Sequence, residues 1–244
     1  MPHLFKDHVA PITPKTHTAP AERRTLLKYQ TPIATLVDLN TYPRLKLYEL
    51  FTTYDVPVVS RTIPIDITNL RVCIKQRNLR FMPTFSFFVT KAMNEIPEFL
   101  HRIENQSLVK FDLVIPSFTV LSEDNILNFA KGVWSDHFGN DYDANLVSIE
   151  RASKGFDQAT HQDGLGEIFI TNIPWYSFTS IHHPYSKFTS SIPIISMGKI
   201  YQENSREIIP FGIQTHHALL DGYHIGLFMK KLEGFLDNPT QFIF

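Results

Sequence analysis

Near the C-terminus, a strand pattern runs into a helical pattern across a short polar junction. Residues 208–214 are typical of a β-strand, and apolar residues from Ile225 to Leu236 recur at helical spacing. Residues 216–222 between them follow the pattern His-His-x-x-x-Asp-Gly. An unperturbed imidazole titrates near neutrality, so a histidine exposed at such a turn can take a proton from a substrate hydroxyl and return it later. The junction therefore predicts a sheet with a C-terminal helix and indicates a candidate general base.

Two other interpretations of this junction remain open on the residues alone. Asp221 is a favoured N-cap residue, which explains the aspartate but leaves the paired histidines and the glycine unexplained. Metal binding is the less favoured alternative, since the chain has 11 His, with His182, His183 and His224 in addition to the pair. However, adjacent histidines project in different directions, and the sequence has neither a His-x-x-x-His helical pair nor a Cys-x-x-Cys motif.

Other catalytic signatures find little support. The chain has no Gly-x-Ser-x-Gly elbow. Cys73 lies in a helical stretch of mixed polarity and is better explained as a packing residue than as a nucleophile. The 10 glycines are scattered, and residues 164–166 lack the lysine or third glycine of a phosphate-binding loop.

Composition restricts the class of protein. A chain of 244 residues with 43% hydrophobic and 19% charged residues fits an ordinary soluble domain. A net charge of −1 without a basic block argues against a nucleic-acid partner. The single cysteine suits a reducing compartment, and we find neither a signal-peptide pattern nor an apolar run of membrane-spanning length. We expect a cytoplasmic protein that binds neither nucleic acid nor membrane.

The distribution of patterns predicts an α+β or mixed α/β protein built around one large sheet. Residues 1–30, which are interrupted by prolines, are expected to form an N-terminal arm, and residues 31–244 a single domain. Helical patterns cover residues 44–54, 66–77, 83–96, 142–154 and a final helix from Gly222. Strand patterns cover residues 56–65, 108–114, 117–121, 167–171, 192–201 and 208–214.

Several segments, in their order and spacing, resemble the chloramphenicol acetyltransferase family, trimeric acyltransferases that share a fold with the dihydrolipoyl acyltransferase cores. These segments are residues 42–44, 116–120, 173–180, 196–199 and 216–224. The resemblance extends from about Tyr42 to the C-terminal helix and leaves out the arm. It implies an α+β two-layer sandwich with a large mixed sheet packed with helices, and a homotrimer with active sites at the subunit interfaces.

The resemblance also implies catalytic roles. His217 would be the general base that deprotonates an acceptor hydroxyl, which then attacks the thioester of acetyl-CoA directly, without an acyl-enzyme. Asp221 would form a buried ion pair with Arg44 that holds the histidine loop in shape. Thr171 occupies the position of a serine that donates to the tetrahedral oxyanion, and one such donor can lower the barrier by roughly 3–4 kcal/mol.

The co-substrate is implied in the same way. Trp175, Lys199 and Ser196 match the part of the family that lies along coenzyme A, with Ser196 in place of a threonine. For Trp175 the alternative is core packing, and for Lys199 a solvated strand end. The resemblance implies no permanently bound cofactor and no metal, with acetyl-CoA acting as a co-substrate.

The expected acceptor pocket differs from the family pattern. Its residues would be Phe51, Asp55, Phe129 and His183, with Phe51 in place of the usual tyrosine and with Asp55 and His183 in place of leucines. Burying a carboxylate and an imidazole in an apolar wall costs free energy unless each finds a partner. We therefore expect transfer to a small-molecule hydroxyl, either that of chloramphenicol or that of a more polar acceptor such as a sugar.

Two alternatives come from other functional classes. A catalytically silent trimeric binding protein with the same fold is favoured by Asp55, His183 and Thr171, which depart from the family pattern. A metal-dependent hydrolase would instead use the histidine clusters. Thiol release from acetyl-CoA distinguishes the first alternative from an enzyme, and elemental analysis tests the second.

Overall fold

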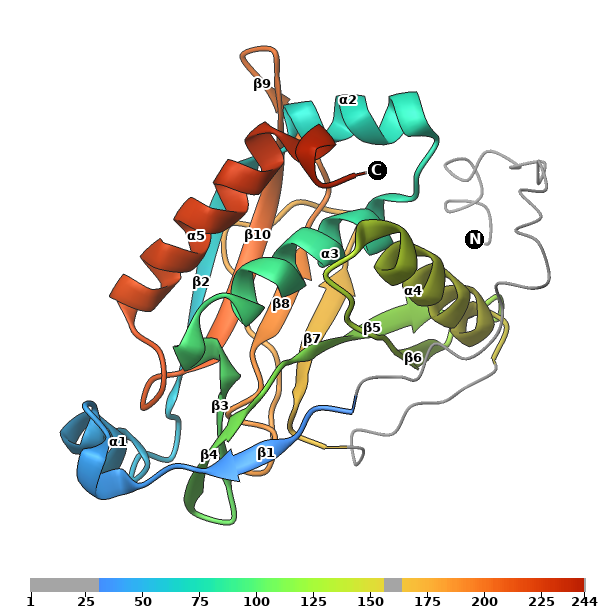
Figure 1. The fold of residues 1–244 in the computed structure, drawn as a ribbon. Helices are drawn as coiled ribbons and strands as arrows, with labels where there is room; N and C mark the ends of the chain where they lie inside the picture. The colour runs from blue at the N-terminus through green and yellow to red at the C-terminus, as the bar shows by residue number, and fades with distance from the viewer. Residues whose placement is uncertain (1–30, 156–163, 244) are drawn as a thin grey trace, which may run out of the picture.

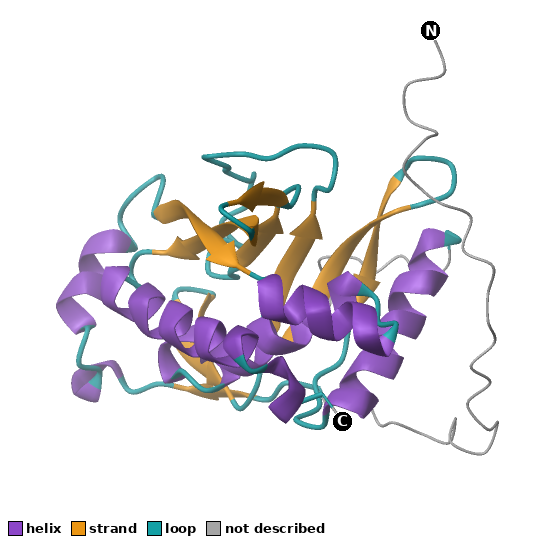
Figure 2. Cartoon of the chain, turned by 90° about the horizontal axis from the view of Figure 1, so that it is seen from above, coloured by secondary structure: helices purple, strands orange, loops and turns teal. Residues whose placement is uncertain are grey.

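A computed structural model describes residues 31–155 and 164–243. The predicted arm, residues 1–30, lies outside the described residues. Helices lie on one face of a large sheet, which gives the two layers visible in Figures 1 and 2. Helix α1 lies apart from this layer, beside the end of the sheet where β2 begins and β10 ends (Figure 1).

The large sheet has seven strands in the order β2-β10-β8-β7-β5-β6, with β9 paired to β10. Strands β5, β7 and β8 run parallel to one another and the remaining pairs are antiparallel, so the sheet is mixed. Its strands are β2 (Val58–Asp66), β5 (Ile115–Leu121), β6 (Leu127–Lys131), β7 (Glu167–Asn172), β8 (Ile194–Met197), β9 (Tyr201–Glu203) and β10 (Arg206–His216). A smaller antiparallel sheet consists of β1 (Ala34–Leu36), β3 (His101–Glu104) and β4 (Ser107–Phe111).

The helices supply the other half of the core. They are α1 (Leu45–Phe51), α2 (Thr68–Arg77), α3 (Phe81–Asn94), α4 (Phe138–Ser153) and α5 (Gly222–Asp237), with short 3-10 turns at Leu39–Thr41, Pro97–Leu100 and Pro239–Gln241. The apolar pattern of α3 predicts a buried helix, and Phe85, Phe88 and Ala92 are indeed fully buried. Cys73 is buried in α2, as expected of a packing residue.

Alternation along β10 determines what each face of the sheet presents. Ile209, Phe211 and Ile213 are buried residues of the main core, and the residues between them point to the opposite face. The helices of the described residues cover the other face (Figure 2), whereas Phe178 and Ile181, from the segment between β7 and β8, pack on this outer face beside Gly212. A Cβ atom on Gly212 would lie 2.6 Å from Ile181, so the glycine allows this segment to pack directly on the sheet.

The predicted strand over residues 192–201 is wrong as a single element. β8 ends at Met197, and β9 begins only at Tyr201. The Gly198 N–H donates to the Pro210 carbonyl at 2.9 Å, but Pro210 has no N–H with which to complete the ladder. The pairing of β8 with β10 therefore stops at the proline, and β9 pairs with β10 further along.

The sequence did not predict β6 or the start of α4, because buried polar residues there interrupt the apolar periodicity. In β6, which was not predicted, Asn128 is buried and donates to the Ala152 carbonyl at 2.9 Å, whereas Leu127 is 60% exposed. Helix α4 begins at Phe138, four residues before the predicted residue 142. Its first turns bury the polar residues Asp141 and Asn145, and the Asn145 side chain donates to Asp141 Oδ1 at 3.0 Å. Strands β1 and β3 are short and were not predicted either.

Within the described part of the chain, no helix combines the length and the apolar composition that crossing a bilayer requires.

Candidate active site

The histidine pair occupies the turn that joins β10 to α5. His216, the last residue of β10, is 4% exposed, and its Nδ1 atom accepts a hydrogen bond from the Ala218 N–H at 3.2 Å. Burial, together with the neighbouring His217, lowers the pKa of His216 to about 4. His216 is therefore a neutral, inward-facing residue that shapes the turn.

His217 is only partly buried and is held on three sides. Its backbone N–H donates to the Pro57 carbonyl at 2.8 Å. The centroid of its ring lies 4.2 Å from the centroid of the Phe51 ring. Its Nδ1 atom lies 3.2 Å from the Leu220 carbonyl oxygen. Because a carbonyl can only accept, this contact requires the proton on Nδ1 and leaves the lone pair on Nε2. The turn thus prepares Nε2 of His217 to accept a proton.

Asp221 combines two of the interpretations of its sequence position. Its Oδ1 atom caps α5 by accepting from the Tyr223 N–H at 3.0 Å, and it also lies 2.8 Å from Nδ1 of His224. Its Oδ2 atom accepts from Arg44 Nη1 at 2.6 Å, across 177 residues of sequence. The ion pair that the resemblance implies is therefore present, although it is only partly buried, with side-chain exposures of 14% and 29%.

Electrostatics keep this aspartate ionised. Burial alone would raise the pKa of Asp221, but the hydrogen bond from Arg44 and the charges of His224 and Arg44 outweigh it. The pKa of the carboxyl group is held well below its usual range. Asp221 consequently fixes the start of α5 and the position of Arg44, and it makes no contact with the His217 ring that would relay a proton.

Arg44→Ala should lower the free energy of unfolding by about 2 kcal/mol at neutral pH, because a partly buried carboxylate loses its cation. The folded-state pKa of Asp221 lies below its unfolded value of about 4, so this contribution is complete above that pH and is lost as the pH falls through the folded-state pKa. Urea unfolding of wild type and variant near pH 7 and near pH 3 measures the effect. The difference should shrink in acid, and an equal difference at both pH values would contradict the assignment.

A second group of polar side chains lies on the outer face of the large sheet. Thr171 and Ser196 are paired residues of the parallel strands β7 and β8, so their side chains are neighbours on one face. The Thr119 hydroxyl donates to the Thr171 hydroxyl, with 2.6 Å between the oxygens. On the other side, Nε2 of His183 lies 2.6 Å from the Ser196 hydroxyl oxygen.

His183 is held through its backbone as well as its ring. The Gln214 side chain accepts from the His183 N–H at 2.9 Å and donates to the His183 carbonyl at 3.2 Å. Burial, together with the neighbouring His182, lowers the pKa of His183, so the ring is neutral at pH 7. The imidazole has therefore found the polar partner that its burial requires.

The sequence model described as chloramphenicol acetyltransferase matches residues 33–233, more than half of the chain. The chain belongs to this family. The chloramphenicol acetyltransferase of Proteus mirabilis is 28% identical over 211 residues, which cover 84% of this chain and 96% of that protein. The predicted family is confirmed, and with it the predicted enzyme class of acetyl-CoA-dependent O-acetyltransferases.

Solved structures show the same fold. A chloramphenicol acetyltransferase structure superposes with a TM-score of 0.76 at 23% identity and covers 84% of this chain and 100% of that one. The cubic core of the pyruvate dehydrogenase multienzyme complex gives a TM-score of 0.59 at 16% identity, with 96% and 99% covered. The predicted α+β acyltransferase fold, with its large mixed sheet and its layer of helices, is thus confirmed.

Most of the expected catalytic residues lie in two groups. We define the base cluster as Arg44, Phe51, His217 and Asp221, which the contacts above bring together. We define the hydroxyl cluster as Thr119, Thr171, His183 and Ser196.

One chain does not bring the two clusters together. Ser196 is paired with Gly212 of β10, and His217 lies about 16 Å further along that strand at 3.3 Å per residue. β7, which carries Thr171, is separated from β10 by β8, which adds about 10 Å across the sheet. A single copy therefore holds His217 and Thr171 roughly 20 Å apart.

Of the three residues expected to lie along coenzyme A, Trp175 and Lys199 are solvent-exposed, whereas Ser196 is buried. Trp175 is 54% exposed, which contradicts its interpretation as a core residue. Lys199 is exposed between β8 and β9, where its N–H donates to the Tyr176 carbonyl at 2.9 Å. Trp175 and Lys199 therefore belong to two segments that touch, just beyond the ends of β7 and β8.

Two residues of the expected acceptor pocket lie outside both clusters. Asp55 is exposed in the loop after α1. Phe129 is partly buried on β6, opposite Thr119 in the β5–β6 register. Of the four expected pocket residues, Phe51 lies in the base cluster and His183 in the hydroxyl cluster.

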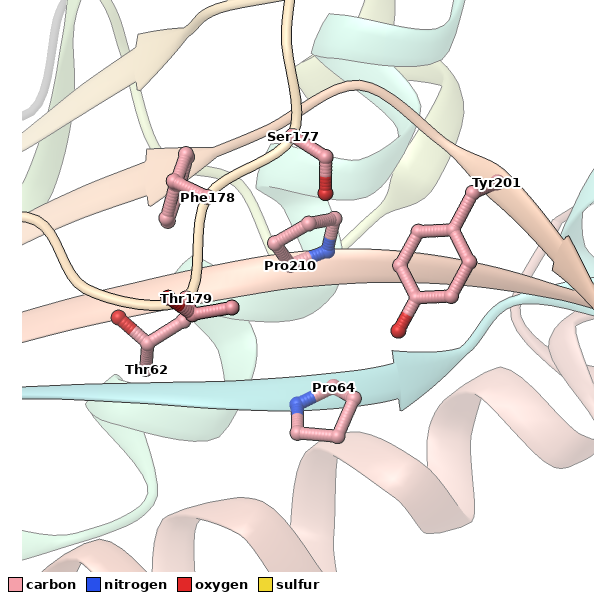
Figure 3. A pocket seen from close by; sticks show the side chains of 7 residues that line it. All are labelled: Thr62, Pro64, Ser177, Phe178, Thr179, Tyr201 and Pro210. Atoms are coloured by element: carbon pink, nitrogen blue, oxygen red, sulfur yellow. The ribbon is translucent and has the colours of Figure 1, made fainter.

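A cavity of about 330 Å³ opens on the same outer face of the sheet. Figure 3 shows that the segment after β7 lies over neighbouring strands there, with hydroxyl groups and rings facing the opening. The lining residues are Thr62, Pro64, Ser177, Phe178, Thr179, Tyr201 and Pro210. The cavity lies beside the Trp175 and Lys199 segments, because Ser177 and Tyr201 follow those residues closely in sequence.

Among the described residues, no group of three or more His, Cys, Asp or Glu side chains is arranged to hold a metal ion. The histidines considered as ligands are engaged elsewhere. His183 bonds to Ser196, His224 to Asp221, and His182 Nδ1 lies 2.9 Å from the Ser60 hydroxyl oxygen.

Several contributors were missed from sequence. The Leu220 carbonyl, which sets the His217 tautomer, could not be recognised from the sequence, because every residue has a backbone carbonyl. Gln214 and Thr119 lie within predicted strands, where their polar side chains could have marked an outer face. His224 was considered only as a metal ligand, although its position three residues after an N-cap aspartate is that of a capping box.

Proposed function

We propose that this enzyme transfers the acetyl group of acetyl-CoA to a hydroxyl group of a small acceptor, with Nε2 of His217 as the general base. The observation that supports this role most directly is the contact between Nδ1 of His217 and the Leu220 carbonyl, which leaves Nε2 free to accept a proton. The Phe51 ring and the Pro57 carbonyl keep the imidazole in this orientation.

The reaction then proceeds without an acyl-enzyme. Nε2 of His217 takes the acceptor's hydroxyl proton while the acceptor oxygen forms a bond to the thioester carbonyl carbon. The resulting tetrahedral oxyanion accepts a hydrogen bond from the Thr171 hydroxyl. When the carbon–sulfur bond breaks, the coenzyme A sulfur leaves as a thiolate and takes the proton back from His217. The products are the acetyl ester and the free thiol.

We propose that the active form is a homotrimer, in which each site combines the base cluster of one copy with the hydroxyl cluster of a neighbour. The roughly 20 Å between His217 and Thr171 within one chain supports this arrangement, because one acetyl group cannot contact both residues at that separation. Trp175 and Lys199, which are exposed beside the hydroxyl cluster, are the proposed contacts for coenzyme A. The single buried cysteine suits a cytoplasmic location.

The acceptor is proposed to be more polar than chloramphenicol, the substrate named for the family's relatives. His183 adds polar atoms where the resemblance implies an apolar wall, and no hydrogen bond joins Nδ1 of His183 to a described residue. A hydroxyl-rich acceptor suits such a ring, because a hydroxyl both donates and accepts and so fits either tautomer.

Release of coenzyme A thiol in the presence of different acceptors tests the function. Chloramphenicol, hexoses and simple polyols should be compared at equal acetyl-CoA concentration. Thiol release that depends on an acceptor supports the proposal. If no acceptor stimulates release while coenzyme A still raises the melting temperature, the chain is a binding protein instead.

His183→Leu should raise kcat/KM for chloramphenicol about tenfold and lower it for hydroxyl-rich acceptors, since the substitution removes a polar group from the proposed pocket. The KM for acetyl-CoA should stay within about twofold of wild type. Steady-state kinetics with both acceptors measure these values. Lower chloramphenicol turnover in a variant that keeps its melting temperature would contradict the assignment of His183 to the acceptor pocket.

A further inference from the structure

A pair of threonine hydroxyls connects two parallel strands of the outer face. Phe118 of β5 is paired with Ile170 of β7, so the next residues, Thr119 and Thr171, lie side by side. Their hydroxyl oxygens are 2.6 Å apart, with Thr119 as the donor and Thr171 as the acceptor. This is a short O–H···O hydrogen bond with a defined direction.

The direction of this hydrogen bond leaves Thr171 with a free donor. A threonine hydroxyl has one hydrogen and two acceptor lone pairs. Because Thr171 accepts along the line to Thr119, its own hydrogen must point elsewhere. No hydrogen bond donated by Thr171 to any described residue is present, and its side chain is only partly buried. The hydrogen is thus available on the outer face, beside Ser196.

We propose that Thr119 is a positioning residue for acetyl transfer, which orients the Thr171 hydroxyl and strengthens it as a donor to the oxyanion. This inference rests on the role proposed above for Thr171. Threonine has staggered side-chain rotamers, and the contact with Thr119 selects the one that turns Oγ1 rather than the methyl group toward β5. A hydroxyl that accepts a hydrogen bond also becomes a better donor, because neighbouring bonds polarise one another.

The contribution of Thr119 should appear in kcat rather than in KM. The acetyl oxygen acquires its full negative charge only in the tetrahedral state, so a stronger donor stabilises that state more than the bound thioester. A purely structural cross-strand pair would behave differently, because its loss would lower the melting temperature and leave kcat unchanged.

Four variants test this inference: Thr119→Val, Thr119→Ser, Thr171→Val and the double variant Thr119→Val/Thr171→Val. Loss of a direct oxyanion donor lowers kcat about 10²–10³-fold, so we expect that loss for Thr171→Val and a smaller loss of about tenfold for Thr119→Val. Thr119→Ser, which keeps the hydroxyl, should stay within about twofold of wild type. The double variant should be no slower than Thr171→Val alone, since Thr119 acts only through Thr171.

The measurements are kcat and KM for acetyl-CoA and for chloramphenicol, or for whichever acceptor wild type turns over fastest, together with the melting temperature. Thr90→Val is the matched control, because it removes a buried threonine hydroxyl from α3, away from the outer face. It should leave kcat within about twofold of wild type.

The outcomes separate the inference from the function on which it rests. An inactive wild type, or an unchanged kcat in Thr171→Val, would overturn the proposed function and with it the role of Thr119. A slow Thr171→Val together with a normal kcat in Thr119→Val would overturn the positioning role alone. Multiplication of the two single effects in the double variant, or failure of Thr119→Ser to restore kcat, would overturn it as well.

Discussion

Substituting alanine for His217 is expected to lower kcat for acceptor-dependent thiol release by about 10³–10⁴-fold, close to the upper limit for a single general base. The substitution removes Nε2, which carries the lone pair of the neutral ring when the Nδ1 proton is donated to the Leu220 carbonyl. The fold should survive, because the backbone hydrogen bond to Pro57 does not depend on the side chain. Thiol-release kinetics, combined with a melting curve, measure both properties.

His216→Asn provides the matched control for this experiment. An asparagine oxygen can accept the Ala218 N–H in place of Nδ1 of His216, so the turn should persist and kcat should stay within about tenfold of wild type. Activity of His217→Ala within tenfold of wild type would contradict the general-base role. A variant of His216 that loses as much activity as His217→Ala, while remaining folded, would mean that the wrong histidine has been assigned.

Mixing two inactive variants is expected to restore activity. In a trimer whose sites combine two copies, His217→Ala still supplies Thr171, and Thr171→Val still supplies His217. Co-expression in equal amounts should give a random mixture of trimers in which about a quarter of all sites are intact, because each site needs the correct variant on both sides. The preparation should therefore reach about a quarter of wild-type activity, which is about 250 to 2,500 times the activity of the His217→Ala protein alone.

Each variant expressed alone provides the baseline for this experiment, and size-exclusion chromatography should give the same trimer elution for all preparations. If the site were contained in one chain, every copy would carry a defect and co-expression would add nothing. Activity equal to the mean of the two parents would therefore rule out shared sites.

The residues that follow one another in sequence were predicted best. His217 and Asp221 could be placed on a strand-to-helix turn because strand and helix patterns directly flank them. Their partners could not be found from spacing. Arg44 lies 177 residues from Asp221, and only the resemblance to a family connected them. The dual role of Asp221, as helix cap and as ion-pair partner, required the coordinates of both oxygens.

The hydroxyl cluster depends on strand order, which local patterns do not specify. Thr119 and Thr171 are 52 residues apart and meet because β5 and β7 are adjacent parallel strands. The sequence indicated that burying His183 would cost free energy unless the ring found a polar partner. That partner, Ser196, lies on β8 and could not be identified from local patterns. Likewise, the two hydrogen bonds between the Gln214 side chain and the His183 backbone require the segment after β7 to fold back over β10.

The separation of the two clusters along one chain has an evolutionary consequence. The base cluster is held by α1, the turn and the start of α5, whereas the hydroxyl cluster is held by the central strands and the segment after β7. A substitution near His183 therefore disturbs none of the hydrogen bonds that set the His217 tautomer. Under the roles proposed above, the His183 side of the acceptor pocket can change while the contacts that hold His217 persist, so a lineage can acquire a new substrate while retaining its chemistry.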